Sequence, residues 1–250
     1  MKIFCLSDPH LGFGVDKPMH VFGDIWRDHA SKIEKAWRNS VGPSDLVIIP
    51  GDISWASNTT NLKPDMDFLG SLPGRILLGK GNHEMWWPKS HAKAASLMPP
   101  NTRLLDSTHP FIEGELAIVG TRMWDNPALS FVKWIQFNPG TSAKDLMDEE
   151  DEAARDKIFA RELQRLDAAL ASLGNAKVRI AAIHYPPTTP DFIPTVVTEK
   201  LSAARVQHCV FGHIHSLKPG TVLSGPLDGV QYHLCAVDHI NFTPRMILEI

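Results

Sequence analysis

The chain has 250 residues, of which 43% are hydrophobic, and its formal net charge is −3 at pH 7. This length is enough for one sizeable core, so we expect residues 1–250 to form a single domain. The slightly acidic balance provides no general basic surface, which argues against a protein whose main partner is a nucleic acid.

The N-terminus contains only a short apolar run, Ile3 to Leu6, which is too short for a signal peptide, and no apolar run long enough to span a membrane occurs. The three cysteines, Cys5, Cys209 and Cys235, are odd in number and each lies in a strand-like run. This pattern predicts buried free thiols and not a disulfide framework. Together these features indicate a cytoplasmic protein with no membrane segment.

Short apolar runs separated by helical patterns indicate an α/β protein with one mixed sheet or two packed sheets. The predicted strands are Lys2–Ser7, Leu46–Pro50, Arg75–Leu78, Leu116–Val119, Val178–Ile183, Cys209–Phe211, Val230–Cys235 and Arg245–Ile250. Apolar residues at spacings of three and four predict one helix from Trp26 to Val41 and another from Phe159 to Leu173. Acidic residues from Asp148 to Glu152 favour the start of the second helix, and Gly174 favours its end.

The stretch GKGNHEMWW, residues 79–87, follows the third predicted strand. Gly74, Gly79 and Lys80 have the G-x-x-x-x-G-K spacing of a phosphate-binding P-loop. However, Gly81 occupies the position where a Ser or Thr would bind magnesium, and the residues between the two glycines form an apolar strand pattern. The stretch is therefore not a P-loop, and its polar residues need another role.

Polar side chains follow five of the predicted strands at the point where each strand ends. They are Asp8 and His10, Asp52, Asn82 with His83 and Glu84, His184, and His213 with His215. The carboxyl ends of strands in α/β sheets are where ligands bind, so we expect these side chains to converge on one site. Alone, Asp8 and Asp52 read as turn residues, whereas the alternating pair His213 and His215 favours a metal even in isolation.

The donor types in this set favour metal ions bound through oxygen and nitrogen. Aspartate, histidine and asparagine are present and cysteine is absent, which suits two divalent ions, Mn, Fe, Zn or Ni, in five- or six-coordinate sites. Two cations about 3.5–4 Å apart can share one carboxylate and one hydroxide for in-line attack on phosphorus. The remaining histidines are expected at surface or structural positions: His20, His29, His91, His109, His208, His233 and His239.

In this order, the motifs DPH, GD, GNHE, His184 and GHIH resemble those of the calcineurin-like metallophosphoesterases, over residues 8 to 215. The stretches KPMHVFGDIW, IPGDISWA and LPGRILLGKGNHEMWW also look like a bacterial branch of that family whose members are known only as predicted phosphohydrolases. The resemblance implies a four-layer αββα sandwich of two mixed β-sheets flanked by helices. It does not name a substrate.

The resemblance also implies a role for each motif residue. Asp8, His10 and His215 would bind one metal ion, Asn82, His184 and His213 would bind the other, and Asp52 would bridge the two. His83 would be catalytic: it would stabilise the transition state or protonate the leaving oxygen, because an imidazole titrates near neutral pH.

Two departures from the family pattern concern the residues around His83. Trp55 stands where the protein phosphatases of the family carry an aspartate that orients this histidine. The arginine that binds phosphate there is also missing, and Arg122 could replace it or could instead pair with Asp125. The alternative carboxylate partners of His83 are Glu84, Asp65 and Asp67.

We therefore expect a metal-dependent phosphoesterase that acts on a small-molecule phosphate ester, with a phosphodiester slightly preferred over a phosphomonoester. A non-catalytic interaction scaffold on the same fold is the alternative from another class. A nuclease would need a basic groove, for which the acidic balance gives no support. The sequence leaves open the oligomeric state, the role of the loop from Asp125 to Asp148, and whether Trp55, Trp86, Trp87 and Trp124 line the site or fill the core.

Overall fold

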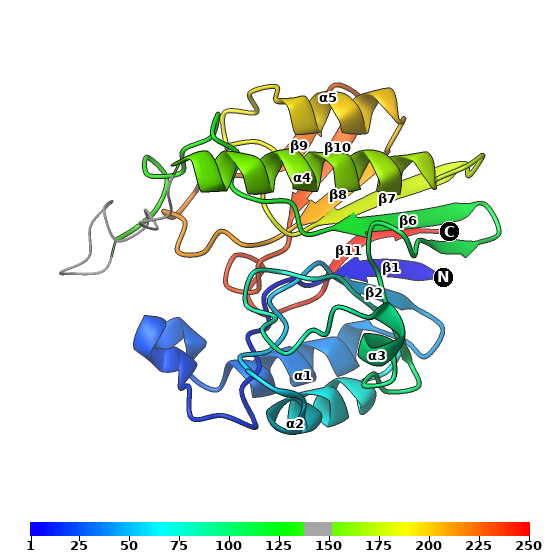
Figure 1. Ribbon diagram of the computed structural model, residues 1–250. Helices are drawn as coiled ribbons and strands as arrows, with labels where there is room; N and C mark the ends of the chain where they lie inside the picture. Colours follow the sequence, from blue (N-terminus) through cyan, green and yellow to red (C-terminus); the bar gives the residue numbers. More distant parts are fainter. Residues whose placement is uncertain (138–151) are drawn as a thin grey trace.

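Two β-sheets pack face to face, and helices cover the outer face of each sheet (Figure 1). The computed structural model describes residues 1–137 and 152–250. This arrangement confirms the predicted α/β fold with two mixed sheets flanked by helices. The two ends of the chain lie side by side, because the first and last strands are antiparallel neighbours.

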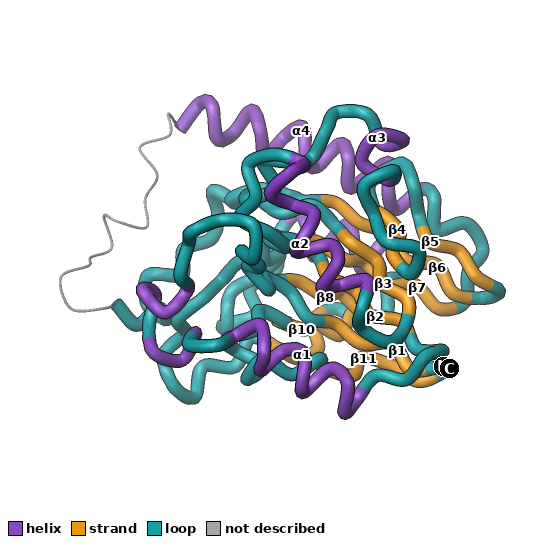
Figure 2. The backbone as a smooth tube through the Cα atoms, turned by 90° about the horizontal axis from the view of Figure 1, so that it is seen from below, coloured by secondary structure: helices purple, strands orange, loops and turns teal. Residues whose placement is uncertain are grey.

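The first sheet has the strand order β11-β1-β2-β3-β4. Its strands are β1 (Lys2–Cys5), β2 (Leu46–Ile49), β3 (Arg75–Leu78), β4 (Thr102–Leu104) and β11 (Arg245–Glu249). Strands β1 to β4 are parallel, and β11 pairs antiparallel with β1. Helices α1 (His29–Ser40) and α2 (Thr59–Gly70) cross the outer face of this sheet, and the short α3 (His91–Ala95) precedes β4 (Figure 2).

The second sheet has the strand order β5-β6-β7-β8-β10-β9. Its strands are β5 (Phe111–Glu113), β6 (Leu116–Thr121), β7 (Val178–Ile183), β8 (His208–Phe211), β9 (Ser224–Leu227) and β10 (Val230–Leu234). The four central strands are parallel, whereas the edge strands β5 and β9 are antiparallel to their neighbours. Helices α4 (Glu152–Ala171) and α5 (Val196–Ala203) cover its outer face.

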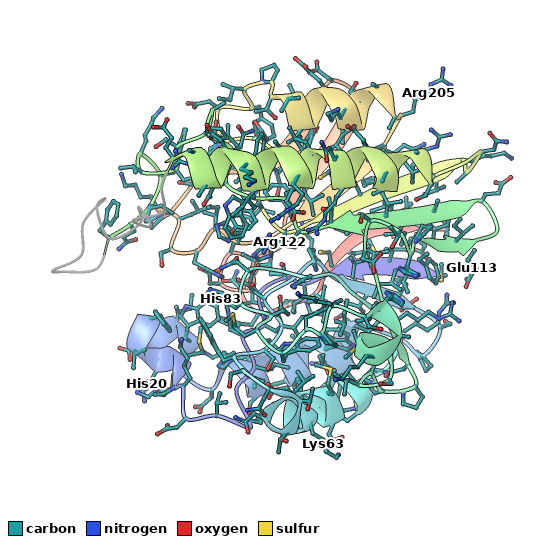
Figure 3. The ribbon with its side chains drawn as sticks, viewed as in Figure 1. His20, Lys63, His83, Glu113, Arg122 and Arg205 are labelled. Atoms are coloured by element: carbon teal, nitrogen blue, oxygen red, sulfur yellow. The ribbon has the colours of Figure 1, made fainter. Side chains whose placement is uncertain are left out.

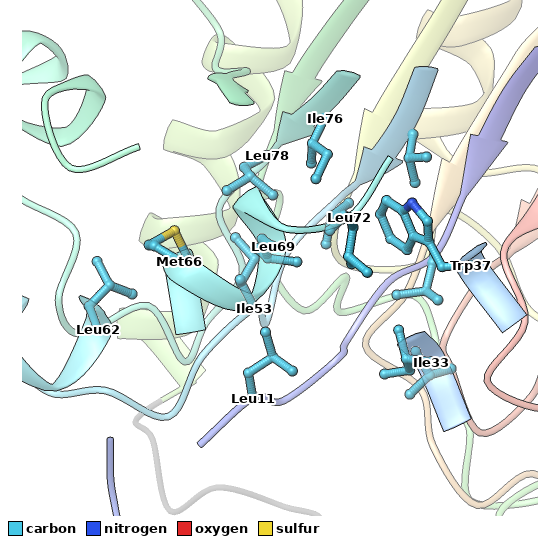
Figure 4. Packing of buried hydrophobic residues seen from close by; sticks show 14 of the residues in the cluster. Leu11, Ile33, Trp37, Ile53, Leu62, Met66, Leu69, Leu72, Ile76 and Leu78 are labelled. Atoms are coloured by element: carbon cyan, nitrogen blue, oxygen red, sulfur yellow. The ribbon is translucent and has the colours of Figure 1, made fainter. Parts of the chain in front are cut away.

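The central strands are apolar on both faces because each sheet is covered on both sides. In β1, for example, Ile3 and Cys5 face the core between the two sheets, whereas Phe4 faces the core beneath the helices. The outer core of the first sheet receives Ile33 and Trp37 from α1 and Leu62, Met66 and Leu69 from α2 (Figure 4). This packing explains why these strands appear in the sequence as continuous apolar runs.

Every predicted strand is present, but several elements are additional to the prediction. Strands β4, β5 and β9 have only three or four residues, and helices α2, α3 and α5 were not predicted. Pro64 lies inside α2, and a proline normally argues against a helix interior. The side chain of Asn58 nevertheless accepts hydrogen bonds from two amides of the first turn and so caps this helix.

The predicted boundaries need one correction at the first helix. We expected the helix to start at Trp26, but α1 starts at His29, because Asp28 before it has a left-handed φ of 54°. Trp26 belongs instead to the short 3₁₀ helix η2 (Asp24–Trp26), which follows another, η1 (Met19–Phe22). Asp148 to Asp151, expected at the start of α4, and residues 138–148 of the predicted loop lie outside the described residues. Residues 125–137 form no helix or strand apart from one bridge between Ile135 and Leu217.

The three cysteines are buried and free, as predicted. None of the helices in residues 1–137 and 152–250 is both long enough and apolar enough to cross a bilayer. Of the histidines outside the motifs, His91 and His109 stack beside Asp106 at a partly exposed position, and His208 and His233 form a pair in the second sheet.

The His208–His233 pair predicts a loss of stability in acid. The two rings share a contact of 3.1 Å between Nδ1 and Nε2, and burial, with the nearby charges of His208 and Arg245, lowers the pKa of His233 to about 4. In the unfolded chain, His233 has the ordinary histidine pKa of about 6.5. The folded protein should therefore lose up to about 3 kcal/mol of stability as the pH falls from about 6.5 to 4.

A His233→Gln variant should show a smaller stability loss over this pH range than the wild type. Denaturant unfolding at about pH 7.5 and pH 4.5 measures the difference. A His20→Gln variant is the control, because His20 is exposed and lies outside this pair. If His233→Gln and the wild type lose the same stability on acidification, His233 does not stay neutral in the folded protein.

Candidate active site

The polar side chains that follow the strands converge at one edge of the sandwich, as predicted. Asp8 and His10 follow β1, Asp52 follows β2, Asn82 and His83 follow β3, His184 follows β7, and His213 and His215 follow β8. The two sheets meet here, because Ser7 after β1 bridges in parallel to Ala236 after β10. Residues up to 205 positions apart thus become neighbours, as in the bond from the His213 amide to Asp8.

Two glycines of the motifs allow the backbone of one loop to lie directly against an aspartate side chain of another loop. A Cβ atom on Gly81 would lie 2.2 Å from Oδ1 of Asp52, and a Cβ atom on Gly212 would lie 2.0 Å from Oδ2 of Asp8. No side chain fits at either position, so these glycines permit the close approach of the loops to the two carboxylates. Several of the polar residues also have left-handed backbones: φ is 59° at Asp8, 45° at His10 and 51° at Asp52.

In residues 1–137 and 152–250 three groups of side chains have metal-binding geometry, and two of them belong to this edge, whereas the third is the partly exposed group His91, Asp106 and His109. Asp8, His10 and His215 form the first cluster of this edge. One donor atom from each lies within 4.8 Å of the others. Nε2 of His10 is 3.2 Å from Nε2 of His215, which in turn is 3.7 Å from Oδ1 of Asp8. Asp8 and His10 are buried. Such separations suit donors that share one ion at about 2.0–2.2 Å from each.

Asp52, His184 and His213 form the second cluster, and Asn82 completes it. Oδ1 of Asn82 lies 2.8 Å from Nε2 of His184 and 3.1 Å from Nδ1 of His213. The Asn82 oxygen therefore faces two imidazole nitrogens, which places one amide and two imidazole donors around a common point. This donor set suits a divalent transition metal ion.

Asp52 belongs to the second cluster and also faces the first. Its Oδ2 is 3.3 Å from Nε2 of His184 in the second cluster and 3.9 Å from Nε2 of His10 in the first. Burial opposes ionisation of Asp52, but the neighbouring imidazoles of His184, His10 and His83 outweigh it and hold its pKa well below the ordinary value. An ionised carboxylate between two sets of imidazoles can contact an ion in each.

The charges of the site fit divalent cations. Burial lowers the pKa of His10 and of His213 well below the usual range, so both imidazoles are neutral and keep a lone pair for a metal. Burial also raises the pKa of Asp8 to about 6, even though His184 and His215 lower it. Carboxylates buried this deeply need a compensating positive charge, which a bound cation would supply.

Asp238 is a site residue that the sequence analysis missed. Its Oδ1 accepts a 2.9 Å hydrogen bond from Nδ1 of His215, and its Oδ2 accepts one from the Ser216 amide. A carboxylate on the far nitrogen of a histidine fixes the ring and directs Nε2 toward a metal. Burial lowers the pKa of His215, but the Asp238 carboxylate outweighs it and raises that pKa to about 9.

An Asp238→Ala variant should bind metal about 10–100-fold more weakly while keeping its fold, because His215 loses its orienting carboxylate. Metal titration of the stripped protein measures the change. Asp191→Ala is the control, since Asp191 is exposed and pairs with Lys133 instead of a site histidine. Equal metal affinity in the two variants would show that Asp238 does not support the site.

Glu84 organises the loops but does not contact the His83 ring. Its carboxylate accepts hydrogen bonds from the backbone amides of Asp52, Ile53 and Gly81, at 3.1, 2.6 and 2.6 Å. Burial and the charge of Asp52 raise its pKa to about 7. By holding both loops, Glu84 fixes Asp52 relative to Asn82.

The expected carboxylate partners of His83 were wrong. Glu84 binds backbone amides, Asp65 accepts from Ser54 and from the Phe13 amide, and Asp67 pairs with Lys63. The His83 side chain is 39% exposed, and its Nε2 lies 3.8 Å from Oδ2 of Asp52. Trp55, which replaces the aspartate of the protein phosphatases, packs beside it with ring centroids 4.3 Å apart.

Arg122 pairs with a residue that the sequence did not suggest. Its Nη2 lies 3.2 Å from Oε1 of Glu162, a fully buried residue of α4 that also pairs with Arg165. The guanidinium stacks over the ring of Trp124 at 4.3 Å, and the backbone oxygen of Arg122 accepts from the amides of His184 and Tyr185. Figure 3 labels both Arg122 and His83, which follow strands of different sheets.

The four tryptophans near the motifs divide into two groups. Trp86 and Trp87 pack in the outer core of the first sheet. Trp55 stacks on the ring of His10 at 4.9 Å, and Trp124 packs against Tyr185 at 5.1 Å beneath Arg122. All four pack against a core, Trp55 against that of the first sheet and Trp124 against that of the second. Trp55 and Trp124 lie in addition beside site residues.

The family assignment follows from sequence comparison. Residues 1–217 match the model of the calcineurin-like phosphoesterases. The chain belongs to this family, and its buried clusters of histidine and aspartate are candidate metal sites of a metallophosphoesterase.

Comparison with solved structures supports the fold. Phosphopantetheinyl hydrolase (PptH) from Mycobacterium tuberculosis is similar with a TM-score of 0.58 at 16% identity, over 100% of this chain and 96% of that one. A protein of unknown function, AQ665 from Aquifex aeolicus, is similar with a TM-score of 0.52 at 13% identity, over 98% and 95% of the two chains. The search of curated proteins found no match.

Proposed function

We propose that this protein is a metal-dependent phosphoesterase whose substrate is a small-molecule phosphate ester. The observation that carries this proposal is the position of Asp52, whose Oδ2 lies between two separate clusters of imidazole donors. Two ions bound on either side of one carboxylate form the arrangement that stabilises attacking and leaving oxygens in phosphoryl transfer. Membership of the calcineurin-like phosphoesterases supports the same reaction.

In this proposal each cluster would bind one divalent ion. Asp8, His10 and His215 would hold the first, Asn82, His184 and His213 would hold the second, and the Asp52 carboxylate would serve both. Mn, Fe, Zn and Ni all accept these oxygen and nitrogen donors, so the donor set leaves the choice among them open. When bound, such ions lower the pKa of a water molecule and neutralise charge on the phosphate.

The protein's own groups have distinct tasks in this mechanism. Asp8 and Asp52 hold negative charge in the site. Glu84 holds the Asp52 loop next to the Gly81 loop, because its carboxylate accepts a hydrogen bond from an amide of each. His83 is in neither cluster and its ring is partly open to solvent. Burial lowers the pKa of His83 and the Asp52 carboxylate opposes that shift, so Asp52 would stabilise the proton that Nε2 gives to the leaving oxygen. Trp55 limits the movement of that ring from one side.

A phosphodiester is the preferred substrate, and a phosphomonoester is the second candidate. A monoester carries a dianionic phosphate and gains most from an arginine clamp, whereas Arg122 is already paired with Glu162. Arg122 remains a candidate substrate-binding residue because it lies beside the His184 loop. The printed name of one structural neighbour, phosphopantetheinyl hydrolase, makes a phosphopantetheinyl ester a suitable test compound.

The test combines metal analysis with hydrolysis. The protein is stripped, reloaded with Mn²⁺, Zn²⁺, Fe²⁺ or Ni²⁺ singly, and assayed with an aryl phosphate monoester, a bis-aryl diester and a phosphopantetheinyl ester. Two ions per chain with activity that returns on addition are expected, and the diester should turn over faster than the monoester. Absence of both bound metal and restored turnover would favour a non-catalytic scaffold.

A further inference from the structure

Lys17 carries a charge at the edge of the site that no part of the mechanism above uses. It lies in the irregular segment between β1 and η1, and its Nζ sits 3.4 Å from the ring centroid of Trp55. A lysine ammonium over an indole face is a cation–π contact, which restricts a side chain that would otherwise sample open solvent. The exposed Lys17 is therefore held at a defined place.

The place is defined because the Trp55 ring is held on several sides. One face stacks on His10 at 4.9 Å with an interplanar angle of 19°, and Nε1 lies 3.1 Å from Sδ of Met19. The same ring lies 4.3 Å from the His83 ring. Trp55 thus connects Lys17 with a residue of the first cluster and with the proposed proton donor.

Lys17 also differs from Arg122 in having no carboxylate partner. In the ranges 1–137 and 152–250, no aspartate or glutamate forms an ion pair with it, whereas Arg122 is paired with Glu162. A held but unpaired ammonium beside a site for anions can offer its full charge and three N–H donors to a ligand. The charge of Arg122, by contrast, is already compensated by the Glu162 carboxylate.

We propose that Lys17 is a substrate-binding residue whose ammonium group contacts a non-bridging phosphate oxygen of the ester placed beside His83. The contact rests on the proposed phosphoesterase function and adds to it a positive group on the Trp55 side of the site. It would supply a single point charge and not the bidentate fork with which an arginine clamps a dianionic phosphate. No covalent step involves Lys17.

The test uses inorganic phosphate as the probe, together with kinetics. In the manganese-loaded full-length protein, Lys17→Ala should raise the Kd of inorganic phosphate about tenfold, which is within the range expected for one partly solvated ion contact. It should raise KM for the best hydrolysed ester of the panel by a similar factor with little change in kcat, because the contact is present before and during reaction. Lys17→Arg should recover most of the binding.

Lys133→Ala is the matched control. It removes one positive charge that also lies over a partly buried tryptophan ring, with Nζ 4.8 Å from the centroid of Trp134, but it has no contact with His10 or His83. Metal content and melting temperature should equal those of the wild type in both variants. Phosphate affinity and KM should change only for Lys17→Ala.

The outcomes separate this proposal from the one on which it rests. A wild type that binds two ions and hydrolyses esters, beside a Lys17→Ala variant with unchanged phosphate Kd and KM, would overturn the role of Lys17 alone. Equal weakening in Lys17→Ala and Lys133→Ala would also overturn it, since net charge would then be the cause. A wild type that binds neither metal nor phosphate would overturn both proposals.

Discussion

An Asp52→Asn variant should lose phosphoesterase activity by at least about 10³-fold, and it should hold fewer than two metal ions per chain. Loss of a single transition-state donor already costs about 10²–10³ in rate, and this change removes a charge that faces both clusters. Asparagine has nearly the same shape as aspartate, so the cause would be the charge. Metal analysis and the ester assay measure the two effects on the same sample.

The substitution leaves the surrounding hydrogen bonds in place. Oδ1 of Asp52 accepts the His83 amide at 2.9 Å, and the carbonyl oxygen of an asparagine can do the same. The Asp52 amide still donates to Glu84. A loss of metal in this variant would therefore reflect the missing charge on Oδ2 and not a collapsed loop.

Asp45→Asn provides the matched control. Asp45 is also buried and also accepts backbone amides, from Lys2 at 2.8 Å and from Gly42 at 2.9 Å, but it lies at the start of β2, away from the motifs. This variant should lose some stability and keep both its metal ions and its activity. Two firmly bound ions and near-normal turnover in Asp52→Asn would contradict the bridging role of Asp52.

The sequence predicted the parts of the fold that are buried on both faces. Strands such as β2 and β7 are continuous apolar runs because a second sheet covers one face and helices cover the other. The short edge strands β5 and β9 lack this signal, since much of their surface is exposed. Pro64 argued against a helix at the position of α2, but packing of its apolar side chains and the Asn58 cap stabilise this helix.

The motif residues could be predicted because each one follows a strand at the same edge of the sandwich. Their supporting residues could not. Asp238 reaches His215 because β10 runs parallel to β8 with Leu234 opposite Phe211, and Glu162 reaches Arg122 from the buried face of α4. Such contacts depend on how strands and helices are arranged in space, and neither residue belongs to a local pattern. An aspartate soon after β10 is the one signal that could have indicated Asp238.

Sequence patterns also could not predict the backbone conformation of the site residues. His10 and His213 have φ angles of 45° and 71°, a region that residues with side chains seldom occupy. Local preference would favour glycine or asparagine at both positions. The surrounding loops hold these imidazoles in a costly conformation, which is typical of residues kept for function.

A His83→Gln variant should keep both metal ions but lose activity according to the leaving group of the ester. His83 belongs to neither cluster, so its replacement should leave metal binding unchanged. General acid catalysis contributes about 10²–10⁴-fold, and glutamine cannot supply the proton. Alkyl phosphate esters, whose leaving alkoxides need that proton, should lose activity within this range, whereas 4-nitrophenyl esters should lose about tenfold or less.

The comparison of leaving groups separates two roles for the imidazole. If His83 only stabilised charge on the phosphate oxygens, alkyl and aryl esters would lose activity equally, because both pass through the same charged phosphate. Its exposed ring, 3.8 Å from Asp52 and 4.3 Å from Trp55, lies at the edge of the two clusters and not within them. A group at that edge is placed for contact with the departing oxygen, so we expect the steeper loss for alkyl esters, and an equal loss on both kinds of ester would contradict the proposed role of His83.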